Sequence, residues 1–471
     1  MKRRDFLSLS AILALSTCFI SCKGAKDTKS LSFTKFSKAM PVPQELNPPL
    51  KNGVKKFELN IKESSKEFFD GINTQTYGID ASYLGPTLRL TNGERVEIKF
   101  NNKLSEETTM HGHGMHVPAS MDGGPHQKII PNSSWTASYT VKQKSCTNWY
   151  HPHLMGETAR QVYQGLAGFI IVDDSESLSL DLPKRYGVDD FVVAIQERRF
   201  TSDGSIDYSP SMMETMRGYK GDYFLANGEI NPYLDVEAKE IRFRLLNASN
   251  SSVYNLRFDD NRAFYQIATD NSFLPNPIMI NNIRLSPGER AEIVVDFTND
   301  LEKEFILKDL NSSSDIFQIR VNKTKTATTT LPNSLTSLNT DSSNVQNTRD
   351  FVLDGRMGRL TINGVSMDMN VINETIPLNQ LEIWNVTNNM MVEHNFHIHA
   401  THFVVLERNG SSSNVLESEK GYKDTVYLAS GDNVKLLVKM TDYSDANTPY
   451  MYHCHFLEHE DNGMMGQFVV T

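Results

Sequence analysis

The chain has 471 residues, 39% hydrophobic and 22% charged. That length suits roughly two to three domains, and the composition argues against a collagenous, disordered or multi-span membrane protein. The net charge of -10 at pH 7 disfavours nucleic acid and anionic membrane surfaces as partners.

Residues 1–22, MKRRDFLSLSAILALSTCFISC, predict an export signal. Arg3 and Arg4 precede an apolar run that is too short for a stable membrane span. This pattern is typical of the twin-arginine route, so we expect an exported, periplasmic protein that folds before translocation. The residues before Cys22 resemble a bacterial lipoprotein box. A lipid anchor at Cys22 therefore stays open, beside a soluble protein that loses Cys18 and Cys22 with its signal.

Short apolar and alternating runs between turn residues predict a mainly β chain after the signal. Four widely spaced segments share a turn, a polar spacer and a strand, which favours duplicated β-sandwich modules. These segments are LRLTNGERVEIKFNN (88–102), RLSPGERAEIVVDF (284–297), IPLNQLEIWNVTN (376–388) and LASGDNVKLLVKM (428–440). We predict a tether at 23–45, module one at 46–175, module two at 185–322, a Ser/Thr/Asn-rich connector at 323–348 and module three at 349–471.

Ten of the 13 histidines fall into four clusters, two in module one and two in module three. They are His111-Gly-His113, His151-Pro-His153, His394-Asn-Phe-His397-Ile-His399, and His453-Cys454-His455 with His459. Side chains at i and i+2 of a strand point to the same face, so each His-x-His pair can direct two imidazoles at one site. The same rule sends the sulfur of Cys454 away from its two neighbours. This predicts two separate metal sites on one short stretch of backbone.

The sulfur side has the ligands of a blue-copper electron-transfer site. Cys454, His459 and Met464 supply a thiolate, an imidazole and a weak thioether, and His394 can complete the set from an upstream strand. Met465 is the alternative axial ligand, although the spacing favours Met464. A zinc site would require more thiolates or a Cys₂His₂ set, which the mature chain does not offer.

Eight clustered histidines remain after His394 and His459 are assigned to the sulfur side. Imidazole ligands alone suit copper, zinc, iron or nickel, so the type of ligand decides little. Eight imidazoles can hold three metals, and with the blue copper this gives four one-electron centres. Four electrons reduce dioxygen fully to water. For His116, His126 and His402 we expect no metal role.

These motifs together resemble those of a known family. HGHG (111–114), WYHPH (149–153), HNFHIH (394–399) and HCHFLEHEDNGMM (453–465) are similar to the four copper motifs of multicopper oxidases. MDGGPHQKIIP (121–131), ARQVYQGLAGFIIVDD (159–174) and GYKDTV (421–426) look like the branch of bacterial copper-efflux oxidases, bilirubin oxidases and spore-coat laccases. The resemblance covers most of the chain after residue 45 and is least diagnostic in module two.

The resemblance implies an all-β fold of three cupredoxin-like Greek-key β-sandwich domains that hold four copper ions. It places the type 1 copper in the third domain and a trinuclear cluster between the first and third. Type 1 copper would take His394, Cys454, His459 and Met464, and type 2 copper would take His111 and His397. The type 3 pair would take His113, His151, His153, His399, His453 and His455. Electrons would enter at type 1 and pass through Cys454 to His453 and His455.

Three carboxylates are candidate catalytic residues. Oxygen reduction consumes protons, and acids near the cluster are the natural donors. Glu460 and Asp122 match residues with proton-relay roles in this branch, and the alternative is that both are ordinary surface or turn acids. Asp424 matches a position close to the type 1 copper, where it can meet a cationic or phenolic reductant; a simple turn acid is the alternative.

The leading hypothesis is a laccase-like multicopper oxidase, an oxidoreductase that oxidises phenols, aromatic amines or cuprous ion and reduces dioxygen to water. A periplasmic cuprous oxidase for copper tolerance is the alternative. It is weakened because the Ser/Thr/Asn-rich connector stands where copper-efflux oxidases carry a methionine-rich insertion, and cuprous ion prefers thioethers.

Three other classes fit less well. A two-domain copper nitrite reductase would lack the extra His pairs, and a purely structural relative should have lost ligands. A non-enzymatic periplasmic copper-binding protein should show exposed Met/His runs. We expect no nucleic-acid partner and membrane contact only through the lipid anchor, and leave the physiological reductant and the oligomeric state open.

Overall fold

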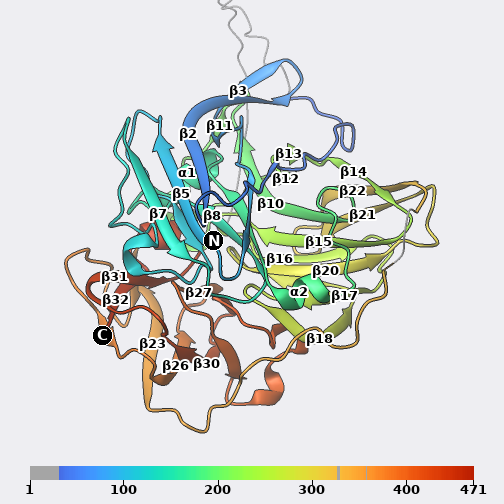
Figure 1. The fold of residues 1–471 in the computed structure, drawn as a ribbon. Coiled ribbons are helices and arrows are strands. Elements are labelled where there is room, and N and C mark those ends of the chain that lie inside the picture. Colours follow the sequence, from blue (N-terminus) through green and yellow to red (C-terminus); the bar gives the residue numbers. More distant parts are fainter. Residues whose placement is uncertain (1–30, 326–328, 357) are drawn as a thin grey trace, which may run out of the picture.

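The computed structural model describes residues 31–325, 329–356 and 358–471 (Figure 1). The predicted signal at 1–22 lies outside these residues. Strands make up 48% of the described residues and helices 7%, which confirms the all-β class. No helix in the described ranges is both long enough and apolar enough to span a membrane. In Figure 1 the blue-to-cyan, green-to-yellow and orange-to-red strands form three groups, and we describe them as modules one, two and three.

Module one is a sandwich of two sheets. One sheet has the order β1-β4-β9-β8-β6 and the other has the order β3-β2-β5-β7. The strands are β1 (Glu45–Leu46), β2 (Val54–Phe69), β3 (Ile72–Ile79), β4 (Thr87–Thr91), β5 (Arg95–Asn102), β6 (His111–His113), β7 (Ser134–Thr140), β8 (Cys146–His151) and β9 (Gly168–Asp173). Burial alternates along β5, because one face of the strand meets the core between the sheets and the other does not.

Module two pairs an eight-stranded sheet with a five-stranded sheet. Its strands are β10 (Asp190–Phe200), β11 (Ile206–Asp207), β12 (Tyr223–Ala226), β13 (Glu229–Ile230), β14 (Tyr233–Glu237), β15 (Glu240–Asn247), β16 (Tyr254–Phe258), β17 (Phe264–Ala268), β18 (Phe273–Ile280), β19 (Ile283–Leu285), β20 (Arg290–Asp296), β21 (Lys303–Asp309) and β22 (Ser314–Lys323). The described part of the expected tether packs on this module, since the Met40 amide donates to the Tyr233 carbonyl at 2.7 Å.

Module three has two five-stranded sheets, β24-β23-β26-β30-β28 and β25-β32-β31-β27-β29. Its strands are β23 (Asn347–Arg356), β24 (Arg359–Ile362), β25 (Glu374–Ile376), β26 (Leu381–Asn388), β27 (His394–Ile398), β28 (Val404–Arg408), β29 (Thr425–Leu428), β30 (Asn433–Lys439), β31 (Asp445–His453) and β32 (Met465–Val470). The described part of the connector packs against module two before it reaches module three. Its Leu335 is buried in one cluster with Leu182 and Phe273.

Few short helices join the strands. They are α1 (Thr158–Gln164), α2 (Ser175–Ser179), α3 (Met212–Arg217), α4 (Leu457–Asp461) and the 3₁₀ turns η1 (Ala119–Met121), η2 (Ser412–Asn414) and η3 (Glu417–Glu419). Asp461 in α4 accepts hydrogen bonds from the amides of Thr158 and Ala159 at 3.1 and 2.8 Å. This carboxylate satisfies the otherwise unpaired first amides of α1 and so ties module three to module one.

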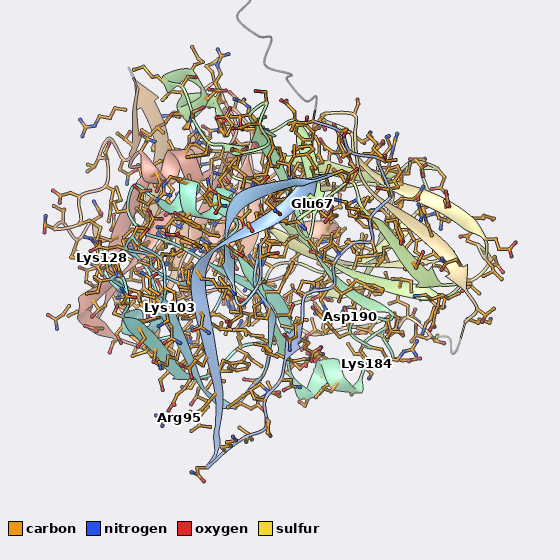
Figure 2. The ribbon with its side chains drawn as sticks, turned by 90° about the horizontal axis from the view of Figure 1, so that it is seen from above. Glu67, Arg95, Lys103, Lys128, Lys184 and Asp190 are labelled. Atoms are coloured by element: carbon orange, nitrogen blue, oxygen red, sulfur yellow. The ribbon has the colours of Figure 1, made fainter. Side chains whose placement is uncertain are left out.

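Charged side chains follow the expected division between surface and interior. Glu67, Arg95, Lys103, Lys128 and Lys184 are exposed, and Figure 2 labels them around the molecule. Asp190, labelled in the same view, is fully buried and bonds Arg244 through both carboxylate oxygens, at 2.7 and 2.8 Å. A buried charge is costly unless it is paired, and this one is.

Candidate metal centres

Strand pairing brings the histidine clusters of each module together. In module one, β6 pairs with β8 so that His111 lies opposite His151. In module three, β27 pairs with β31 so that His397 lies opposite His453. Across the two modules, the rings of His111 and His399 stack with centroids 4.0 Å apart, and those of His113 and His397 stack at 3.8 Å. The histidine clusters of modules one and three therefore face each other. Eight buried imidazoles therefore converge between modules one and three.

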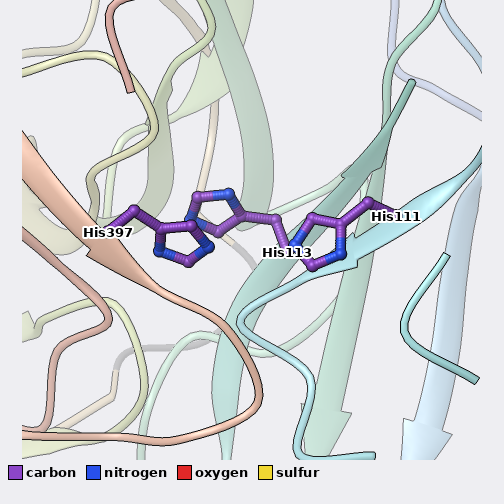
Figure 3. A group of neighbouring side chains, drawn as sticks. All are labelled: His111, His113 and His397. Carbon is purple, nitrogen blue, oxygen red and sulfur yellow. The ribbon is translucent and has the colours of Figure 1, made fainter. Parts of the chain in front are cut away.

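The first group consists of His111, His113 and His397 (Figure 3), whose ligand atoms lie within 4.8 Å of one another. His111 Nδ1 lies 2.8 Å from the Asp122 carbonyl and His397 Nδ1 lies 2.9 Å from the Asp424 carbonyl. Within the described chain, the Nε2 atoms of both histidines are buried without a hydrogen-bond partner. An imidazole held at one nitrogen with the other left open is the usual arrangement around a metal.

Two further groups contain three histidines each: His113, His151 and His455, and His153, His399 and His453. In the second, His453 Nε2 lies 3.2 Å from His153 Nε2 and 3.1 Å from His399 Nε2. Burial, followed by the neighbouring imidazoles, holds the pKa values of these three histidines well below the usual range. Neutral imidazoles with converging lone pairs are the form that binds a metal, so the residues fit a metal at each group.

The sulfur-containing group consists of His394, Cys454 and His459, all fully buried. Cys454 Sγ lies 3.4 Å from His394 Nδ1 and 3.6 Å from His459 Nδ1, and the two nitrogens are 3.1 Å apart. Cys454 thus belongs to one group while its neighbours belong to the other groups, as strand geometry predicts. Burial raises the pKa of the Cys454 thiol to about 12, so a metal that takes it as thiolate must displace a proton.

Met464 is placed beside this group by a tight turn. After α4, which carries His459, the chain turns at Gly463 with a φ of 94°. The Met464 carbonyl accepts from the Cys454 amide at 3.0 Å, and the Met464 side chain is buried in the same core as Cys454. Met465 instead lies opposite His453 in the β31–β32 pair, so it shares the face of His453. This register favours Met464 over Met465 as the axial ligand.

Asp122 and Glu460 each contact one histidine from module one and one from module three. Asp122 Oδ2 lies 2.7 Å from His399 Nδ1, and its Oδ1 lies 3.4 Å from His111 Nδ1. Glu460 lies 3.3 Å from His153 Nδ1 and 3.2 Å from His453 Nδ1. Burial, and then Asp461, raises the pKa of Glu460 well above its usual value. Both acids are therefore positioned to exchange protons next to the histidines.

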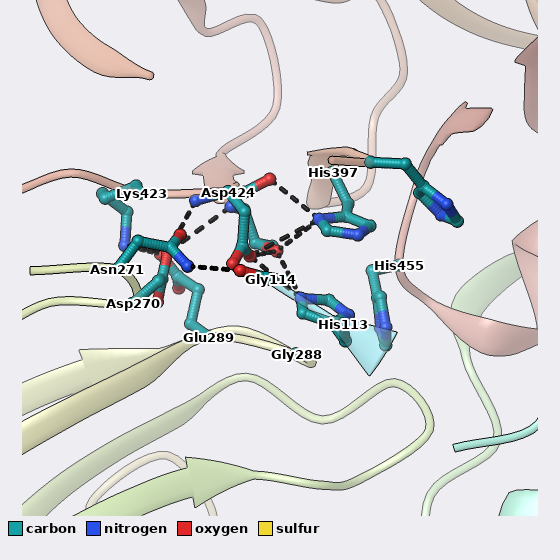
Figure 4. Close-up of polar contacts among 12 residues, drawn as sticks. His113, Gly114, Asp270, Asn271, Gly288, Glu289, His397, Lys423, Asp424 and His455 are labelled. Atoms are coloured by element: carbon teal, nitrogen blue, oxygen red, sulfur yellow. Dashed lines mark hydrogen bonds and ion pairs between the residues drawn. The ribbon is translucent and has the colours of Figure 1, made fainter. Parts of the chain in front are cut away.

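The structure contradicts the prediction that Asp424 lies where it can meet a reductant at the type 1 copper. Asp424 is fully buried, its Oδ1 lies 2.9 Å from His113 Nε2, and its carbonyl contacts His397 (Figure 4). Arg290 donates to both carboxylate oxygens at 2.8 and 2.6 Å. Burial alone would raise the pKa of Asp424, but Arg290 and His113 hold it well below the usual value. Asp424 therefore orients two histidines of the first group and does not face solvent.

Arg290 is a residue that sequence reasoning missed. It lies in module two, is fully buried, and donates to Thr147 and Asn148 of module one as well as to Asp424 of module three. Asp270 and Lys423 extend this network through a 2.9 Å ion pair (Figure 4). In the sequence Arg290 is one charged residue in an ordinary strand, so no local signal separates it from others.

Comparisons with known proteins find relatives over most of the chain. Family models described as multicopper oxidase match residues 60–177 and 328–471. The chain is 39% identical to the multicopper oxidase mco of Staphylococcus haemolyticus, over 89% of both proteins. It is 34% identical to the cell division protein FtsP of Escherichia coli, over 100% of this chain and 99% of that protein. A crystal structure of laccase from Pediococcus acidilactici superimposes with a TM-score of 0.85 and 32% identity, covering 94% of this chain and 95% of that one.

Proposed function

The chain belongs to the multicopper oxidase family, and on that premise we propose that it oxidises a reductant by single electrons and reduces dioxygen to water. The carrying observation is that eight buried histidines from modules one and three converge beside a thiol held by two further histidines. Copper ions bound at these groups would supply four one-electron centres, which matches the four electrons that dioxygen requires.

Different sets of residues would hold the different copper ions. His394, Cys454, His459 and Met464 would hold the copper that accepts electrons, and His111 with His397 would hold the type 2 ion. His113, His151 and His455 would hold one type 3 ion, and His153, His399 and His453 the other. Cys454 is bonded through the backbone to His453 and His455, so the route from the sulfur to both type 3 groups is covalent.

Family membership alone does not separate an oxidase from a relative with another role, because the FtsP similarity extends over the whole chain. The ligand set supports the oxidase. Each of the twelve predicted positions holds a side chain able to bind copper, and all of these side chains are buried. A protein that used only the outer surface of this fold would have no need for such a set.

Oxygen consumption by the copper-loaded protein tests the proposal. With a phenol or an aromatic amine, we expect four reductant molecules oxidised per dioxygen consumed, together with strong absorption from thiolate-to-copper charge transfer. A fully loaded, coloured protein that consumes no dioxygen with any reductant would instead be a copper-binding protein without oxidase activity.

The position of several methionines supports cuprous ion as a second candidate reductant. Met390 Sδ lies 3.0 Å from His394 Nε2, and Met216 packs against the same core as Cys454. Met212 and Met213 are 78% and 58% exposed, and α3 brings Met212 next to the β23–β24 turn. Met390 of module three and Met216 of module two thus lie beside the sulfur-containing group or its core without a methionine-rich insertion, and cuprous ion prefers thioether ligands.

Replacing Met212 and Met213 in α3 by leucine separates the two kinds of reductant. If these thioethers bind cuprous ion, the KM for cuprous ion rises while the KM for a phenol stays unchanged. Equal KM values for cuprous ion before and after the substitution would leave the phenol oxidase as the better description.

We also propose that the protein is exported to the periplasm. The support is the paired arginines and apolar run of residues 1–22, with Cys22 in a lipoprotein-like context. Lysine at Arg3 and Arg4 should retain the protein in the cytoplasm. Cys22→Ser should move a lipid-anchored protein from the membrane fraction to the soluble fraction, and an unchanged distribution would argue against the anchor.

A further inference from the structure

Met390 lies against the open nitrogen of one histidine in the sulfur-containing group. It precedes His394 by four residues, and its Sδ lies 3.0 Å from His394 Nε2. Its backbone is fixed on both sides, because its amide donates to Asn388 and its carbonyl accepts from Ser430, both at 2.9 Å. A side chain at Gly355 would come within 2.9 Å of the Met390 methyl, so the glycine leaves room for it.

The contact favours one of the two neutral tautomers of His394. A thioether can only accept a hydrogen bond, so this contact is a hydrogen bond only when the neutral imidazole is protonated at Nε2. The lone pair is then on Nδ1, which lies 3.4 Å from Cys454 Sγ and 3.1 Å from His459 Nδ1. Met390 therefore selects the tautomer that offers Nδ1 to a metal.

The acceptor at His394 differs in strength from those at five other clustered histidines. His113 and His399 face carboxylates, and His111, His151 and His397 face backbone carbonyls. A strong acceptor on the outer nitrogen makes an imidazole a better electron donor to its metal, and a thioether is a weak acceptor. His394 is thus held in place without being made more basic.

We propose that Met390 is a positioning residue that fixes the His394 tautomer and, as a weak acceptor, keeps the reduction potential of the copper at the sulfur-containing group high. This rests on the proposed function only in that a copper ion binds there. A high potential at this ion favours withdrawal of electrons from poor reductants, and the neighbouring thioether controls it without being a ligand.

Three variants test the role. Met390→Leu removes the acceptor at similar volume, Met390→Gln offers a stronger amide oxygen, and Met391→Leu is the matched control at a side chain that is 92% exposed. In copper-free protein, nitrogen NMR should find His394 protonated at Nε2 in the wild type and Met390→Gln, and a mixture of tautomers in Met390→Leu. In copper-loaded protein, Met390→Gln should lower the potential and Met390→Leu should reduce copper affinity at this site about tenfold.

The outcomes separate the inference from the proposed function. A wild-type protein without a thiolate-to-copper band would remove the proposed function, whereas the tautomer measurement would still stand. A coloured wild type whose potential is unchanged in Met390→Gln, or changed equally in Met391→Leu, would overturn the role of Met390. If Met390→Leu fails to fold, Met390→Gln with its control still decides the matter.

Discussion

The sulfur-containing group and the histidine cluster are built on different principles, although they share the tripeptide His453–His455. The sulfur-containing group takes its four candidate ligands from module three alone. The cluster is divided between modules one and three, and Arg290 of module two supports it through Asp424. The first group thus depends on local chain geometry, and the second depends on how three modules dock. Substitutions should therefore affect one without the other.

The largest effect is expected from Cys454→Ser. Loss of the thiolate should abolish the charge-transfer colour and nearly all oxygen consumption, because electrons lose their entry point, while copper content falls by one ion per chain. Absorption, metal analysis and oxygen uptake measure these three results. Cys146→Ser is the matched control, since Cys146 is also a buried free cysteine but lies outside the groups. Loss of all copper in Cys454→Ser would mean that the two regions are not separable.

Asp424→Asn should weaken copper binding at the histidine cluster and leave the charge-transfer absorption of the sulfur-containing group unchanged. The substitution leaves Arg290 buried without its carboxylate, which costs about 3–5 kcal/mol of stability. It also takes the charged acceptor from His113, which should lower copper affinity at the cluster by about 10–100-fold. Thermal unfolding and metal analysis report the two losses. Asp70→Asn is a control at a side chain that is 70% exposed. If Asp424→Asn instead loses the charge-transfer absorption while the histidine cluster keeps all its copper, the substitution affects the sulfur-containing group and not the cluster, which is the opposite of the expected result.

The sequence predicts features set by local chain geometry, but it does not predict contacts that depend on how the modules dock. The β class is confirmed, and the opposite directions of Cys454 and its neighbours follow from the pleat of a single strand. The partners of Asp424 could not be predicted, because contact with Arg290 depends on the register between modules that lie far apart in the chain. Met390 has no local signal in the sequence, since its contact with His394 depends on the shape of a loop.

A moderate effect is expected at the two acids that join the halves of the cluster. Glu460→Gln and Asp122→Asn keep the shape of each side chain but remove its ability to transfer a proton. Each should slow oxygen reduction by about a hundredfold while the charge-transfer band persists. Rapid mixing of reduced protein with dioxygen measures this step directly. Normal turnover in the double variant would assign both acids a structural role only.

The smallest effect is expected at the edge of the interface between modules one and three. Asp442 accepts a hydrogen bond from Lys142 at 2.7 Å and contacts His116 at 3.0 Å, and the Lys142 bond lowers the pKa of Asp442 to about 2. Because the pKa is lower in the folded state, this stabilisation is present above the ordinary value of about 3.9 and is lost as the pH falls towards 2. The pair is partly exposed, so its contribution to the free energy of unfolding is small.

Asp442→Asn tests whether docking of the two modules, and not local geometry, limits the cluster. Asparagine tolerates the positive φ of 64° at this position, so the change removes the charge without backbone strain. The stability difference from the wild type should be present at neutral pH and vanish towards pH 2, as chemical denaturation can measure. The cluster of the variant should lose copper slightly faster than the wild type, and the sulfur-containing group should not. If the stability difference between Asp442→Asn and the wild type instead grows on acidification, the assigned ion pair between Asp442 and Lys142 is wrong. A protonated Asp442 carboxyl no longer attracts Lys142, so the contribution of this pair must fall with the pH.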